Sequence, residues 1–181
     1  MVVHLVKIPQ NRVGALVGPE GKTKQEIEER SGCVLQIDSQ SGEIEIEDDK
    51  AFEPVLTLKV RDAVRAIGRG FSPEHALRLF QDDAFLEIVD MTEFVGKETK
   101  HLERVRARVI GTSGKTRRAI EEATGCEVSI WGKTVSLIGE ANEVSAAREA
   151  VELLLNGANH GTVYKFLERK RKELRLADMG L

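Results

Sequence analysis

The chain has 181 residues, with 41% hydrophobic and 31% charged side chains and a formal net charge of −3. This composition is typical of a globular protein with room for two small domains, and the negative net charge disfavours a protein that coats nucleic acid. No apolar run is long enough to cross a bilayer, and the chain starts without a signal-peptide pattern. We therefore expect a cytoplasmic protein.

The first predicted domain, residues 1–70, combines short strands with helices. Ile44 and Ile46 alternate with Glu43, Glu45 and Glu47, so one face of their strand should be apolar and the other acidic and wet. Thr23 and Glu26 have the spacing of a helix capping box. The expected elements are a strand at His4–Ile8, helices at Arg12–Val17 and Lys24–Ser31, strands at Val34–Asp38 and Glu43–Glu47, and a helix from about Phe52 to Ile67.

A connecting helix is predicted within residues 71–83. Ser72 and Pro73 form a helix start, and an apolar stripe follows over residues 72–81. Since no segment rich in glycine and serine or in proline occurs, we expect this helix to replace a flexible linker.

The second predicted domain, residues 84–156, has the same element order with an insertion after its first strand. The expected elements are a strand at Phe85–Val89, a helix at Leu102–Ile110, strands at Val128–Trp131 and Val135–Ile138, and a helix at Ala141–Leu155. Residues 157–181 form a C-terminal helical extension, with a helix at Thr162–Leu176 that has one apolar stripe and one basic face. The apolar stripe predicts that this helix packs on the second domain.

A stretch of about twenty residues occurs twice. Residues 17–37 and 110–130 share ten identities at a constant shift of 93 positions, which indicates an internal duplication. Cys33 and Cys126 fall at equivalent strand positions of the two copies, so we expect both to be reduced and packed in the sheets.

Each copy contains two glycines separated by two residues, at the start of a helix. Glycine permits a positive φ and lacks the Cβ that would keep a ligand away from the backbone. A helix N-terminus presents N–H groups without helical partners and the positive end of the helix dipole. A sugar-phosphate backbone can therefore lie against such a turn.

The repeated pattern, an apolar residue, Gly-x-x-Gly-Lys, a helix, a Thr/Ser-Gly turn and a strand ending in Ile, resembles the type I KH RNA-binding domain. The resemblance implies an α+β fold with two type I KH domains (β-α-α-β-β-α) in tandem, in which the glycine loops clamp single-stranded RNA. The two KH units, the charged tail and the segment with Gly157, His160 and Tyr164 resemble the archaeal branch of the partner-of-Nob family of small-subunit ribosome assembly factors.

That family resemblance implies binding to the 3′ region of small-subunit ribosomal RNA during ribosome assembly and pre-rRNA processing. It also implies two protein partners, a pre-rRNA processing endonuclease and the alpha subunit of the translation initiation factor that delivers initiator tRNA. The RNA-binding residues expected from the two loops and their basic flanks are Gly111, Thr112, Ser113, Gly114, Lys115, Arg117, Arg118 and Arg108 in the second copy, and Gly18, Gly21, Lys22, Lys24 and Arg12 in the first.

The two copies differ in charge. Residues 97–118 contain eight basic and two acidic side chains, which surround the second glycine loop. The variable pair of the first loop is Pro19-Glu20, in which Pro19 lacks a backbone donor and Glu20 repels phosphate. One alternative is therefore a protein-interaction scaffold with a degenerate first KH domain. Another is an RNA-binding subunit of an RNA-degrading complex.

Enzyme chemistry is not expected. Gly-Lys-Thr occurs twice, but a phosphate-binding P-loop needs another glycine five residues before its second glycine, and those positions hold Leu16 and Val109. The four histidines are scattered without ligand partners at metal-binding spacing. We therefore predict no cofactor, no metal and no catalytic residues.

Overall fold

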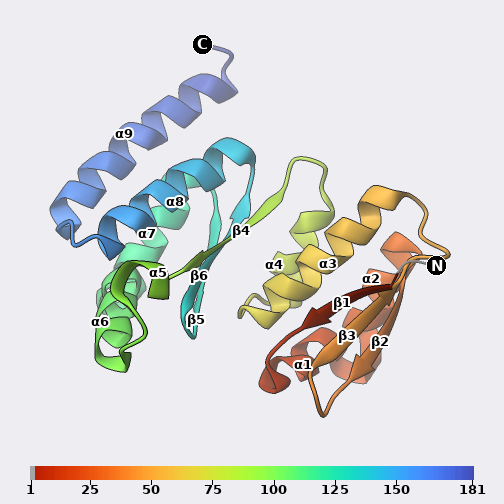
Figure 1. Cartoon of the computed structure of the whole chain (residues 1–181). Helices are drawn as coiled ribbons and strands as arrows, with labels where there is room; N and C mark the ends of the chain where they lie inside the picture. The colour runs from red at the N-terminus through yellow and green to blue at the C-terminus, as the bar shows by residue number, and fades with distance from the viewer. Residues whose placement is uncertain (1–2) are drawn as a thin grey trace. The chain divides into compact units, whose positions relative to one another are not determined.

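The computed structural model describes residues 3–181 and separates the chain into two compact units, with the division between Asp82 and Asp83. Each unit contains a three-stranded antiparallel sheet in which the third strand of the unit lies in the centre, with the orders β1-β3-β2 and β4-β6-β5 (Figure 1). The expected α+β fold with two tandem KH-like units is confirmed.

The first unit follows the order strand, helix, helix, strand, strand, helix. Its elements are β1 (Val3–Lys7), α1 (Gln10–Val17), α2 (Lys22–Ser31), β2 (Val34–Asp38), β3 (Glu43–Glu47) and α3 (Pro54–Gly68). The alternation in β3 has the predicted consequence, because Ile44 and Ile46 are fully buried whereas Glu43 and Glu45 are exposed. The helices therefore cover one face of this sheet, and its other face is acidic.

The predicted capping box of Thr23 and Glu26 is wrong. Helix α2 begins at Lys22, directly after Gly21, and no side chain caps it. Thr23 lies in the first turn and is buried against Gly18. The Thr23 side chain therefore packs against the loop backbone at Gly18 and does not cap the helix.

The segment after α3 forms a short helix, α4 (Pro73–Ala76), followed by a 3-10 turn at Leu77–Phe80. The predicted start at Ser72 is confirmed, since its Oγ accepts a hydrogen bond from His75 N at 3.4 Å. A continuous helix over 72–81 is not formed. The 3-10 turn places residues three apart on one side, and Ala76 and Leu79 are both buried where this segment packs on α3.

The second unit repeats this order with one insertion and one addition. Its elements are β4 (Phe85–Asp90), α5 (Thr92–Val95), α6 (Thr99–Ile110), α7 (Lys115–Thr124), β5 (Glu127–Trp131), β6 (Thr134–Gly139), α8 (Ala141–Leu155) and α9 (His160–Asp178). The insertion holds the short helix α5, at whose start Asp90 Oδ1 accepts hydrogen bonds from the backbone N and the hydroxyl of Thr92 at 2.9 and 2.7 Å. The buried side chain of Met91 anchors it to the core.

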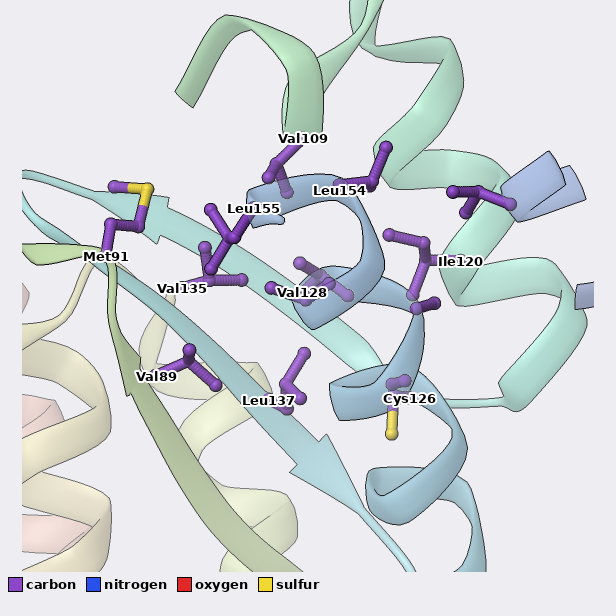
Figure 2. Close-up of a cluster of buried hydrophobic side chains, with 14 of the residues drawn as sticks. Val89, Met91, Val109, Ile120, Cys126, Val128, Val135, Leu137, Leu154 and Leu155 are labelled. Atoms are coloured by element: carbon purple, nitrogen blue, oxygen red, sulfur yellow. The ribbon is translucent and has the colours of Figure 1, made fainter. Parts of the chain in front are cut away.

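The core of the second unit lies between its sheet and its helices (Figure 2). Val135 and Leu137 of β6 face Val109, Ile120 and Leu154 of the covering helices. Helix α9 packs on α7 and α8 through Val163, Phe166 and Leu167, which confirms the prediction made from its apolar stripe. Within residues 3–181, no helix is both long and apolar enough to span a membrane.

Candidate nucleic-acid interface

The two glycine loops have the same backbone conformation. Gly18 and Gly111 have φ of 74° and 73° with ψ of 174° and 173°, and Gly21 and Gly114 have φ of 74° and 75° with ψ of 12° and 16°. In both loops the second variable residue is left-handed as well, with φ of 55° at Glu20 and 52° at Ser113. The duplication in sequence is therefore a duplication of loop geometry.

The first position of each loop requires glycine for two reasons: its φ is positive, and a side chain there would clash with the next helix. A Cβ built on Gly18 would lie 2.9 Å from Thr23 N, and one built on Gly111 would lie 2.7 Å from Thr116 N. Neither backbone atom can move without unwinding the first turn of the next helix. The second glycines differ, because a Cβ on Gly21 would meet nothing within 4 Å and one on Gly114 only the end of Arg118, at 3.3 Å.

Both loops deliver the chain into a helix N-terminus that no side chain caps. Helices α2 and α7 start at Lys22 and Lys115 without a side-chain hydrogen bond to their first turn. Such an end carries the positive pole of the helix dipole and suits an anion. Thr112 and Ser113 of the second loop are exposed, as are Pro19 and Glu20 of the first.

Three predicted cations of the second unit, Lys115, Arg117 and Arg118, lie directly after its loop. Arg118 donates a hydrogen bond from Nη1 to Ser113 O at 2.8 Å and so holds the loop from the helix side. Lys115 is exposed, with Nζ 5.8 Å from the centre of the Tyr164 ring. Arg117 pairs with Glu121 at 3.5 Å and remains partly exposed. These three predicted residues lie together on the first turn of α7.

Two further arginines extend from α6 in different directions. Arg106 donates a hydrogen bond to Gly132 O, in the turn between β5 and β6, at 3.4 Å. Arg108 donates to Ala158 O, and its own carbonyl lies 3.0 Å from His160 Nε2. The predicted site residue Arg108 is thus directed toward the start of α9 and Arg106 toward the hairpin.

The first loop has fewer cations, and those it has are paired with acids. Lys22 lies 3.8 Å from Glu20, and Lys24 lies 3.8 Å from Glu28. The structure places Arg12 away from the loop: its Nε and Nη2 donate to Ile67 O and Phe71 O, both at 2.8 Å. Burial lowers the pKa of Arg12. We conclude that Arg12 fastens the end of α3.

Sequence reasoning missed a second shared feature, the link between each helix and the strand that follows it. Glu28 Oε1 accepts a hydrogen bond from Leu35 N at 2.8 Å, and Glu121 Oε1 accepts one from Val128 N at 3.1 Å. The repeated Glu-Glu pair was the available signal, because Glu28 and Glu121 occupy the same position of the repeat.

It also missed the role of Tyr164 in the second unit. The Tyr164 hydroxyl lies 3.1 Å from Thr116 Oγ1, and Thr116 in turn lies against Gly111. Helix α9 therefore supports the second loop from behind, and only the structure reveals this contact.

Metal ligation is not supported by the described part of the chain, where no group of three or more His, Cys, Asp or Glu side chains is close enough to hold an ion. Cys33 and Cys126 are free and buried as predicted, but each lies one residue before its strand, β2 or β5, and not within the sheet.

Comparisons with known proteins agree with this geometry. A KH-domain model matches residues 3–53, and a model described as a eukaryotic type KH-domain (KH-domain type I) matches residues 85–172. A KH domain-containing protein of Methanocaldococcus jannaschii is 45% identical over 179 residues, which make up 99% of this chain and 78% of that protein.

Solved structures are also similar. The crystal structure of Dim2p from Pyrococcus horikoshii has a TM-score of 0.87 and 44% identity over 93% of this chain and 99% of that chain. A crystal structure of an a/eIF2alpha-aDim2p-rRNA complex from the same organism contains a chain with a TM-score of 0.89 and 44% identity, over 95% of both chains.

Two glycine loops on uncapped helices, each within a β-α-α-β-β-α unit, define a tandem KH-domain RNA-binding protein. More narrowly, the chain belongs to the archaeal Dim2 family, whose second domain is a KH domain of the PNO1 type.

Proposed function

We propose that this protein binds single-stranded RNA mainly through the glycine loop of its second unit, and that the RNA is the 3′ region of small-subunit ribosomal RNA during ribosome assembly and pre-rRNA processing. The observation that carries the proposal is the combination of an exposed Thr112-Ser113 pair, an uncapped helix N-terminus and three cations on the next helical turn. Phosphates lie against N–H groups, hydroxyls and cations of this kind.

The single-stranded form of the RNA follows from the fold class. Gly-x-x-Gly loops hold a strand of about four nucleotides by its backbone, with the bases free to be read. The assignment to ribosomal RNA is supported by the Pyrococcus horikoshii relative, which was crystallised with rRNA.

We also propose that the alpha subunit of the initiation factor that delivers initiator tRNA is a protein partner, since the same relative was crystallised with a/eIF2alpha. One observation favours the first unit as a protein-contact surface. Glu43, Glu45 and Glu47 of β3 alternate with the buried residues, and Leu5, opposite Glu45 on β1, is 67% exposed. An acidic face with an exposed leucine is a poor surface for RNA.

The experiment that tests the RNA assignment compares one sequence in two forms. Fluorescence anisotropy is measured for the full chain with a labelled single-stranded RNA from the 3′ end of small-subunit rRNA, and with the same RNA annealed to its complement. We expect clear preference for the single strand. Equal affinity for both forms would indicate binding through general charge attraction and would contradict the proposal.

A further inference from the structure

Behind the second glycine loop, the second unit contains an open hollow of about 540 Å³. Arg104 and Arg108 line it from α6, Lys115 and Thr116 from the start of α7, and His160 and Tyr164 from α9. Gly111 and Thr112 line the hollow on the side of the loop.

The hollow lies on the side of α6 that faces away from the hairpin. Arg106 reaches the β5–β6 turn through its hydrogen bond to Gly132 O. Arg108 follows two residues later, about 200° further around the helix, and contacts Ala158 and His160. The side of α6 that carries Arg106 therefore faces the β5–β6 hairpin, and the side that carries Arg108 faces the hollow.

The chemistry of the hollow suits a nucleotide. Arg104, Arg108 and Lys115 supply positive charge, and none of the described residues that line it is acidic. The Nε–H of Arg108 is buried and meets no acceptor within residues 3–181, and a bound anion would offset part of this cost by charge attraction to the guanidinium group. Tyr164 and His160 add aromatic surface of the kind on which bases stack.

In the described part of the first unit, the positions equivalent to the two arginines of the hollow are not basic. At the shift of 93 positions, Arg104 and Arg108 correspond to Asn11 and Ala15. Its chain continues after α3 into α4, which packs on α3, whereas α9 packs on α7, the helix that follows the second loop. The two arginines and the α9 wall of the hollow therefore belong to the unit that we propose as the main RNA site.

We propose that this hollow binds a ribonucleotide that flanks the segment held by the second glycine loop, with its phosphate between Arg104 and Lys115 and its base against Tyr164. This inference rests on the proposed function and extends it to the RNA beyond the loop. Lys115 belongs to both surfaces and Gly111 and Thr112 border both, so a strand held at the loop has a continuous path into the hollow. This continuity favours RNA over an acidic protein segment as the occupant.

The test uses the full chain, two RNA lengths and a matched control. Arg104→Gln removes a cation of the hollow, and Lys100→Gln removes an exposed cation one turn earlier on α6, outside the hollow. Affinities are measured over a salt series for a four-nucleotide RNA and for an eight-nucleotide RNA. For the longer RNA we expect Arg104→Gln to lower affinity about fivefold and to reduce the salt slope by about 0.7, the value for one phosphate contact on a single strand.

The same variant should bind the four-nucleotide RNA normally, and Lys100→Gln should bind both RNAs normally. If Arg104→Gln behaves like Lys100→Gln on the longer RNA, or weakens both RNAs equally, the inference is wrong. A synthetic acidic peptide that binds the wild type but not Arg104→Gln, while the RNA affinities stay unchanged, would assign the hollow to a protein and would also overturn it.

A second measurement locates the RNA directly. 5-Bromouridine is placed at each position of the eight-nucleotide RNA in turn and photocrosslinked. We expect adducts on Tyr164 or His160 from a nucleotide outside the four that the glycine loop holds. Crosslinks confined to other residues would contradict the inference. If the loop is the main site, Thr112→Asp with Ser113→Asp should weaken binding of both RNAs. If this variant weakens binding while Arg104→Gln has no effect, the inference about the hollow is wrong and the proposed function stands.

Discussion

The two KH units share a loop backbone and the lysine that follows it, but they differ in the charge of the other side chains around the loop. Both loops have the same sequence of positive φ values and the same threonine beneath the first glycine. The second unit has arginines where the first has small or neutral side chains: Arg104, Arg106, Arg108 and Arg118 correspond to Asn11, Val13, Ala15 and Gln25. Loop geometry is therefore a property of the fold, and we propose that the flanking charges decide which copy holds RNA more tightly.

The largest effect is expected at the glycines of the loop backbone that the two units share. Gly18→Ala and Gly111→Ala should each lower the free energy of unfolding of their own unit by about 3 kcal/mol, because the new Cβ meets the backbone of the next helix at a positive φ. Gly21→Ala and Gly114→Ala, which meet open space or a flexible side chain, should cost only about 1 kcal/mol.

Thermal and urea unfolding measure these differences. Equal costs for the first and second glycine of one loop would show that the contact with Thr23 or Thr116 is unimportant and that φ alone decides.

The next effect tests the charge difference. Lys115→Gln, Arg117→Gln and Arg118→Gln together should weaken RNA binding about 100-fold, since each charge-assisted bond to phosphate contributes on the order of 1 kcal/mol. Lys22→Gln with Lys24→Gln should cost only a few-fold, because only two cations are removed and Glu20, 3.8 Å from Lys22, already repels phosphate there. Anisotropy titrations at fixed salt give both numbers, and a larger loss from the first-unit pair would reverse our assignment.

A smaller effect concerns Arg12, whose equivalent in the second unit is the buried Val105. Arg12→Ala should destabilise the first unit by about 2 kcal/mol, because two hydrogen bonds from a charged donor to the end of α3 are lost. RNA affinity should stay within twofold of the wild type. Arg30→Ala, which removes an exposed cation paired within α2, serves as the control and should change neither quantity.

The sequence predicted most of the fold because its signals are local. Alternation in β3, the apolar stripe of α9 and the glycine ends of α2 and α7 each depend on neighbouring residues, and the structure agrees with them. The duplication then predicted the same element order in both units, with an insertion after the first strand of the second, and α5 lies in this insertion.

The long-range contacts could not be predicted in the same way. Arg12 is a basic residue close in sequence to a glycine loop. Nothing in the neighbouring residues indicates that it donates hydrogen bonds to the carbonyls of Ile67 and Phe71, more than fifty positions away. The contact of Tyr164 with Thr116 likewise joins the tail to the loop across 48 positions. Such contacts decide which cations remain free, so the sequence predicts where basic residues gather along the chain but not what each arginine contacts.

The most direct test of our central claim gives both loops the same Asp-Asp pair, which adds two negative charges to the second loop and one to the first, where Glu20 is already acidic. Thr112→Asp with Ser113→Asp introduces two carboxylates at exposed positions where phosphates should lie, and both glycines stay in place. Pro19→Asp with Glu20→Asp makes the same loop in the first unit. Titrating both variants with one short single-stranded RNA, we expect the second-unit variant to lose about tenfold or more in affinity through like-charge repulsion and the first-unit variant much less. A greater loss in the Pro19/Glu20 variant would show that the principal RNA site lies in the first unit and would contradict the account.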